Sequence, residues 1–130
     1  MLDQELIRGQ LGCNSTCVVI LQEDVKLLKN VYDVKADNSN SNMILGELNK
    51  ENLKNNLDKL TEENNIAYLI IEEIDKLDSK QQEKYINIIK NREFRGYYLP
   101  KNVIIALTIK SKENLSKISS ELYHFCVVAF

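Results

Sequence analysis

Two carboxylates follow the most apolar segment of the chain. Residues 68–71 read Tyr-Leu-Ile-Ile, and Glu72 and Glu73 come directly after them. A short apolar run of this kind predicts a strand that is buried on both faces, so we expect the two acids at its carboxyl end. A phosphate-bound magnesium ion needs carboxylate or water oxygens beside a loop of free backbone N–H groups. The strand end is therefore a candidate metal and phosphate site, and the alternative is a plain polar strand end at the sheet surface.

The segments around these acids alternate between predicted strands and predicted helices. Strands are predicted at residues 5–8, 32–36, 66–74, 103–109 and 126–130. Helical faces are predicted at Leu53, Leu57 and Leu60, at Tyr85, Ile88 and Ile89 after an N-cap at Ser79, and at Leu115, Ile118 and Leu122. Because strands alternate with helices across short connections, we expect an α/β fold in three layers, with a parallel sheet and flanking helices.

Residues 17–28 allow two interpretations. Val18, Leu21, Val25 and Leu28 recur at i, i+3, i+7 and i+10, which is the spacing of one helical face. Val18, Val19 and Ile20 are β-branched, which favours a strand at residues 17–21 instead. We prefer the helix and keep the strand as the alternative.

Length and composition restrict the classes of function. With 130 residues, the chain is expected to form one domain, residues 1–130. A net charge of -2 excludes a dedicated nucleic-acid-wrapping protein, and we expect no direct contact with nucleic acid. The longest apolar runs, Val18 to Leu21 and Tyr68 to Ile71, are far shorter than the roughly 20 residues that a membrane helix needs. We therefore expect a cytoplasmic protein that does not enter the membrane.

The cysteine content points to the same compartment. Cys13, Cys17 and Cys126 are an odd number without a CxxC pair, and His124 is the only histidine. A disulfide framework or a zinc site would need more of these residues, so we expect reduced thiols.

The acidic strand end resembles the Walker B segment of AAA+ ATPases. The resemblance extends beyond the acids through Ile74, Asp75, Lys76 and Leu77. It continues over residues 92–97, Arg-Glu-Phe-Arg-Gly-Tyr, and residues 99–106, Leu-Pro-Lys-Asn-Val-Ile-Ile-Ala. This order is similar to the MoxR-type and clamp-loader-like branches of the family, and it covers about half of the chain. The resemblance implies a P-loop NTPase-like fold, an AAA+ core without its C-terminal lid, and ATP and Mg as cofactors.

The resemblance also implies a phosphate-binding loop near the N-terminus. The only glycine cluster there is residues 9–16, Gly-Gln-Leu-Gly-Cys-Asn-Ser-Thr, which has the length of a GxxxxGKT loop and contains Gly9 and Gly12. In that register Asn14 takes the place of the second glycine, Ser15 replaces the lysine, and Thr16 supplies the hydroxyl that meets magnesium. Loss of the lysine removes a charge-assisted contact worth about 1.5–3 kcal/mol.

Other positions implied by the family also differ. Glu72 stands where the magnesium-orienting aspartate is expected, and Glu73 matches the catalytic base. Lys110 falls on the sensor 1 asparagine, and His124 falls on the arginine finger. Phosphoryl transfer depends on positioning and on charge neutralisation, so we expect very weak turnover at most.

These observations predict a degenerate AAA+-like domain that is a weak or inactive ATPase. We expect it to act as a binding or scaffold module for an AAA+ subunit or another protein. The partner surface is predicted at residues 92–98, since this turn-rich segment carries two arginines and three aromatic residues, which are typical of interface hot spots. The main alternative is an active ATPase with a divergent phosphate loop. A more distant alternative is a flavodoxin-like signalling domain with Glu23 and Asp24 after its first strand.

Overall fold

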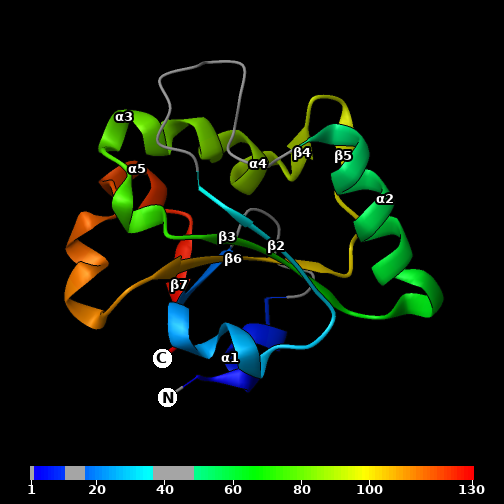
Figure 1. Cartoon of the computed structure of the whole chain (residues 1–130), viewed down its shortest axis with the longest axis horizontal. Coiled ribbons are helices and arrows are strands. Elements are labelled where there is room, and N and C mark those ends of the chain that lie inside the picture. The colour runs from blue at the N-terminus through cyan, green and yellow to red at the C-terminus, as the bar shows by residue number, and fades with distance from the viewer. Residues whose placement is uncertain (1, 11–16, 37–48) are drawn as a thin grey trace.

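The computed structural model describes residues 2–10, 17–36 and 49–130. Its centre is a five-stranded sheet in the order β2-β3-β6-β1-β7, and every neighbouring pair of strands is parallel. The strands are β1 (Cys17–Leu21), β2 (Val31–Lys35), β3 (Ala67–Glu72), β6 (Val103–Ile109) and β7 (Cys126–Val128). The predicted α/β class and parallel sheet are therefore confirmed (Figure 1).

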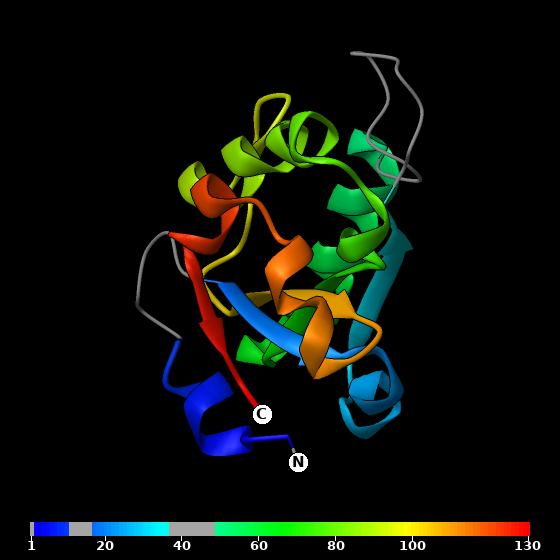
Figure 2. The same ribbon diagram turned by 90° about the vertical axis from the view of Figure 1, so that its left-hand side faces the viewer.

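Helices lie on both faces of this sheet. They are α1 (Gln4–Arg8), α2 (Lys50–Leu60), α3 (Ser79–Gln82), α4 (Ile86–Asn91) and α5 (Ser120–Tyr123). Helices α2 to α5 cover one face, and α1 lies against the other, as Figures 1 and 2 show. Short 3₁₀ helices connect them: η1 (Gln22–Leu27), η2 (Glu62–Asn64), η3 (Ile74–Lys76), η4 (Glu83–Tyr85) and η5 (Lys112–Lys117). A small antiparallel hairpin is formed by β4 (Glu93–Phe94) and β5 (Tyr97–Tyr98).

The three inner strands hold the core together. Every residue of β1, β3 and β6 is buried, as expected for parallel strands that are covered on both faces. Alternate side chains enter two separate clusters. Leu69 and Ile71 pack toward α2 and α4, whereas Tyr68 and Ile70 pack toward α1. Among the described residues, no helix has the length and apolar character needed to cross a membrane.

The N-terminal third of the chain differs from the expectation. Residues 5–8 are not a strand, because the Asp3 carboxylate accepts a hydrogen bond from the Leu6 N–H (3.0 Å) and begins α1. The helix predicted over residues 18–28 is also wrong, and the strand alternative at residues 17–21 is confirmed as β1. Three consecutive β-branched residues buried between β6 and β7 outweigh the helical spacing.

The flavodoxin-like alternative is not supported. That layout has the strand order 2-1-3-4-5, in which the first strand lies between the second and the third. Here β1 lies between β6 and β7, while β2 is at the far edge of the sheet and pairs with β3.

The later elements agree more closely with the expectation. Strand β6 has the predicted bounds, and α2 buries Leu53 and Leu57 as predicted. The cap at residue 79 is off by one position, because Asp78 caps α3 through a capping box with Gln81. The remaining expected helices are shorter and broken, since η4 separates α3 from α4 and η5 precedes α5. Residues 37–42, a polar run that is typical of a surface loop, lie outside the described residues.

Candidate functional site

The carboxyl ends of β1, β3 and β6 meet at one edge of the sheet because the three strands are parallel neighbours. In open α/β sheets this edge is the usual place for ligands. Gln22 follows β1 directly, Glu72 ends β3, and Thr108 and Lys110 lie at the end of β6. Sequence reasoning identified Glu72 and Lys110 in this group and missed Gln22 and Thr108.

Glu72 is held by a hydrogen-bonded chain that crosses all three strands. The Gln22 amide Nε2 donates to Glu72 Oε1, and the Thr108 hydroxyl donates to Gln22 Oε1. The same hydroxyl accepts the backbone N–H of Glu73 at 2.8 Å. Glu72 is only 8% exposed. Burial raises the pKa of its carboxyl above the ordinary value; donation from Gln22 lowers it, while the neighbouring Asp33 raises it further.

Glu73 adopts a left-handed backbone conformation, with φ of 66° and ψ of 37°. Its Oε1 accepts a hydrogen bond from Lys76 Nζ at 2.8 Å, and the two form a salt bridge at the start of η3. This hydrogen bond raises the pKa of Lys76. The candidate base is therefore engaged by a cation three residues along its own chain.

Asp75 joins η3 to the segment after β6. Its Oδ2 accepts the backbone N–H of Lys110 at 2.9 Å and the Asn114 amide at 2.7 Å. The side chain is 9% exposed, so both contacts are shielded from solvent. A cavity of about 240 Å³ lies beside these groups and is lined in part by Gln22, Glu73 and Lys110.

Of the predicted phosphate-loop residues, the structure describes only Gly9. Gly9 ends α1 with a right-handed conformation, φ -63°, while Gly12, Asn14, Ser15 and Thr16 lie outside the described residues. The described residues do establish the order of elements, since α1 precedes this segment and β1 follows it. In a P-loop the strand comes first and the loop leads into a helix.

Sheet register places the start of β1 away from Glu72. Val18 pairs with Ala106, and Ala106 pairs with Ile70, so Cys17 is level with Leu69. Glu72 lies three positions farther along the sheet, about 10 Å at the usual rise of a strand. Cys17 therefore lies at the amino edge of the sheet, whereas Glu72 lies at the carboxyl edge.

His124 is likewise at the amino edge. It caps α5 and is followed by β7, whose first residue, Cys126, pairs with Cys17. The imidazole is exposed and lies edge-on to Phe125, with ring centroids 5.2 Å apart. Strands β1 and β6 lie between β7 and β3, the strand that leads to Glu73.

Most of residues 92–98, the predicted partner surface, pack against the rest of the domain. Phe94 and Tyr97 are buried, and the Tyr97 hydroxyl donates to Asp58 Oδ1 at 2.8 Å. The Arg92 guanidinium donates to the carbonyls of Pro100 (2.9 Å) and Val103 (2.7 Å). Tyr98 is 74% exposed, so it is the aromatic residue of this hairpin that remains available at the surface.

Glu72, Glu73 and Asp75 do not fit a magnesium nucleotide. Glu72, Glu73 and Asp75 already have partners within the chain, namely Gln22 for Glu72, Lys76 for Glu73, and Asn114 with the Lys110 N–H for Asp75. On η1, by contrast, Oδ2 of Asp24 is buried without a hydrogen-bond partner among the described residues. The described residues contain no group of three or more histidine, cysteine or acidic side chains that could hold a metal ion. Neither a protein-family model nor a curated protein matches the sequence significantly.

Proposed function

We propose that the chain is an AAA+-like α/β domain that binds a protein partner and has lost ATP hydrolysis. The proposal rests mainly on one observation, the Gln22 side chain that joins Glu72 and Thr108 at the carboxyl edge. In a nucleotide-binding site of this class, carboxylate and hydroxyl groups at this edge face the ion and the phosphates. Here the Glu72 carboxylate and the Thr108 hydroxyl both form hydrogen bonds with the Gln22 side chain.

The segment that follows β1 supports the same proposal. A P-loop would occupy this place, between the first strand and a helix. Residues 22–27 are instead the 3₁₀ helix η1, Gln-Glu-Asp-Val-Lys-Leu, which contains no glycine. The anion-binding geometry of a P-loop depends on glycines that let consecutive backbone N–H groups approach a phosphate. We propose that η1 replaces the phosphate-binding element, while residues 66–106 keep the AAA+-like pattern.

The exposed end of the β4–β5 hairpin is the proposed partner surface. Arg95 and Gly96 form its two-residue turn with φ of 49° and 91°, both positive, as in the tight turns that suit hairpins. The Arg95 guanidinium lies 5.1 Å from the Phe94 ring centroid, and Tyr98, which pairs with Glu93, is exposed. A hairpin that presents an arginine in its turn and an exposed tyrosine on its second strand has the composition of an interface hot spot.

Calorimetric titration of Mg-ATP into the purified chain tests the loss of the nucleotide site. We expect no saturable heat at millimolar nucleotide. A sub-millimolar dissociation constant that weakens in Glu72→Ala would contradict the proposal and favour the active ATPase with a divergent loop.

Affinity capture from the native cell tests the partner surface separately. Wild-type chain, Tyr98→Ala and Tyr123→Ala are compared, because Tyr123 is also exposed but lies on α5. We expect Tyr98→Ala to lose partners that Tyr123→Ala retains. Identical sets of captured proteins would exclude the hairpin as the interface.

A further inference from the structure

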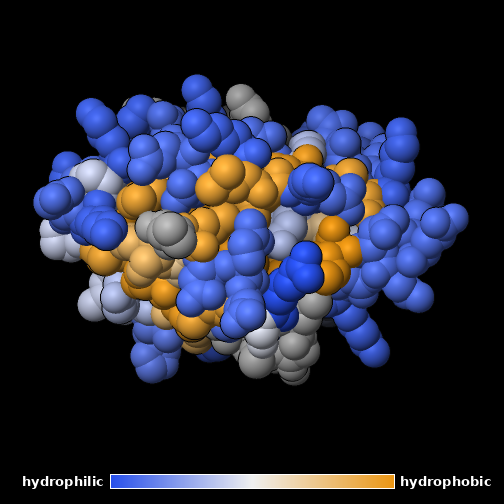
Figure 3. All heavy atoms as spheres, turned by 90° about the horizontal axis from the view of Figure 1, so that it is seen from below, coloured by the Kyte–Doolittle hydropathy of each residue, from blue (hydrophilic) through white to orange (hydrophobic). Residues whose placement is uncertain are grey.

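One face of the sheet is thinly covered and carries a groove. Helices α2 to α5 cover the opposite face, whereas among the described residues this face has only the five-residue α1 and the neighbouring η1 (Figure 2). Seen from this side, apolar atoms reach the surface between polar ones (Figure 3). Leu27, at the edge of the groove, is 51% exposed. The groove has a volume of about 330 Å³, in the range of small-molecule sites.

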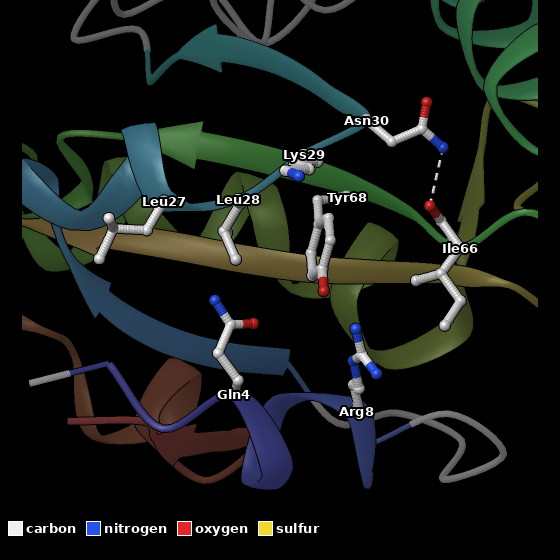
Figure 4. Close-up of a pocket in the computed structure, with 8 residues that line it drawn as sticks. All are labelled: Gln4, Arg8, Leu27, Leu28, Lys29, Asn30, Ile66 and Tyr68. Atoms are coloured by element: carbon white, nitrogen blue, oxygen red, sulfur yellow. Dashed lines mark hydrogen bonds between the residues drawn. The ribbon is translucent and has the colours of Figure 1, made fainter.

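The groove has an apolar floor and polar groups that converge on it. Leu28, Ile66 and Tyr68 line it from the sheet side, and Arg8 lines it from α1 (Figure 4). The wall is fixed by Asn30, whose amide donates to the carbonyls of Leu60 (2.8 Å) and Ile66 (2.7 Å). Because this amide already donates to two carbonyls, we expect ligand hydrogen bonds to come from other groups.

Tyr68 carries a hydroxyl that opens into this groove. The residue is 6% exposed, and its ring belongs to the core beneath α1. Figure 4 shows the hydroxyl pointing toward Arg8. Within the described part of the chain this hydroxyl has no hydrogen-bond partner. A tyrosine hydroxyl that reaches the groove can donate a hydrogen bond to an acceptor on a ligand.

The charge of the groove is positive. Arg8 and Lys29 line it, and no acidic residue does. Neither cation forms a salt bridge with another described residue. A guanidinium is a planar fork that matches a carboxylate, and a nearby hydroxyl donor adds a further hydrogen bond to the same anion.

We infer that this groove binds a small organic carboxylate with an apolar body. The carboxylate lies between the Arg8 guanidinium and the Tyr68 hydroxyl, and the apolar body lies on Leu28 and Ile66. Lys29 contributes a second positive charge at the rim. This site is on the opposite face of the sheet from the β4–β5 hairpin, so its test does not depend on the outcome for the proposed function.

Octanoate, 1-octanol and octylamine are suitable probes because they share one apolar body and differ in charge. Each is titrated into the ¹⁵N-labelled chain, and the backbone amide shifts are followed by NMR. We expect octanoate to shift residues of α1, residues 27–30 and residues 66–68, with an affinity about tenfold above that of 1-octanol. Octylamine is expected to bind more weakly than either.

Two variants separate the polar contacts from the apolar floor. Tyr68→Phe keeps the ring and removes the hydroxyl, and Arg8→Gln removes the charge. Both should weaken octanoate binding about fivefold or more and leave 1-octanol unchanged. Lys26→Gln is the matched control, because Lys26 is exposed on η1 but does not line the groove. Unchanged amide shifts far from the groove confirm that each variant is folded.

Four results would overturn this inference. One is octanoate binding that is no tighter than 1-octanol binding. Another is octanoate affinity that is the same in Arg8→Gln, Tyr68→Phe and the wild-type chain. The third is an equal response to inorganic phosphate, which would show an anion site that needs no apolar body. Absence of any octanoate-induced shift at millimolar concentration has the same consequence.

Discussion

Gln22 donates a hydrogen bond to Glu72 from the end of β1 to the end of β3, across the strand β6 that lies between them. The carbonyl of the same amide accepts from Thr108 on β6. One amide side chain therefore uses its donor and its acceptor to join three strands. Because buried polar groups need partners, each member of this chain depends on the other two.

Removing Gln22 should destabilise the fold. In Gln22→Ala the Glu72 carboxylate loses its donor and the Thr108 hydroxyl loses its acceptor, while both stay shielded by the sheet. We expect a loss of about 1–3 kcal/mol in the free energy of unfolding, measured by urea denaturation. Gln4→Ala is the control, since Gln4 is exposed at the start of α1, and should change stability by less than about 0.5 kcal/mol.

Thr108→Val tests whether the three groups act as one unit. The substitution keeps the shape of the side chain and removes the hydroxyl that accepts the Glu73 N–H and donates to Gln22. We expect the combined Gln22→Ala and Thr108→Val variant to lose less stability than the sum of the single variants, with a coupling energy of about 0.5–3 kcal/mol. Additive losses would mean that the two residues are energetically independent.

Glu72 should make stability depend on pH. Burial raises the pKa of this carboxyl in the folded state, so the folded chain holds the proton more tightly than the unfolded chain. The stabilisation that comes from the proton is present below the unfolded pKa of about 4.3 and is lost as pH rises through the folded pKa. The free energy of unfolding of Glu72→Gln, relative to that of the wild-type chain, should therefore be higher at pH 7 than at about pH 4.

Asp33 provides the second half of this measurement. Its side chain raises the pKa of Glu72, so Asp33→Asn should lower that pKa toward its ordinary value. In the Asp33→Asn background, the pH-dependent advantage of Glu72→Gln is expected to shrink. Urea unfolding of the four chains between about pH 4 and 7 provides the test, and an advantage independent of pH would contradict it.

The aromatic residues of the β4–β5 hairpin should separate into structural and surface groups. Phe94 is 3% exposed and packs in the main core, so Phe94→Ala should cost about 3–5 kcal/mol of folding free energy. Tyr98 is 74% exposed, and Tyr98→Ala should change stability by less than about 0.5 kcal/mol. Thermal or urea unfolding distinguishes the two, and a large loss in Tyr98→Ala would remove its value as an interface probe.

The sequence predicted the second half of the fold better than the first. Strand β6 and the strand that ends at Glu72 are continuous apolar runs, and such runs indicate strands that are buried on both faces of a parallel sheet. Residues 17–28 carried two patterns, and the tertiary position of β1 between β6 and β7 decided in favour of the strand. Local periodicity contains no information about which strands become neighbours.

The candidate site was predictable in part for a related reason. Glu72 and Glu73 stand at a visible strand end, and Thr108 is the only polar residue within residues 103–109. Gln22 becomes a site residue only once β1 is recognised as a strand that ends at Leu21. The pairing of the acids with Gln22, Lys76 and Asn114 depends on contacts between distant segments, which a single sequence does not reveal.

The Cys17 thiol should be unreactive while the chain is folded. Its Sγ lies 3.1 Å from Cys126 Sγ, and the residue is fully buried at the amino end of β1. The hydrogen bond with Cys126 and burial both raise the pKa of Cys17, so little of the reactive thiolate is present near neutral pH.

In a Cys13→Ser and Cys126→Ser chain, we expect a disulfide reagent such as DTNB to label Cys17 only as urea unfolds the protein. The matched chain with Cys13→Ser and Cys17→Ser leaves Cys126, which is partly exposed and should react faster under native conditions. Equal rates for the two thiols in the folded state would show that the amino ends of β1 and β7 open to solvent.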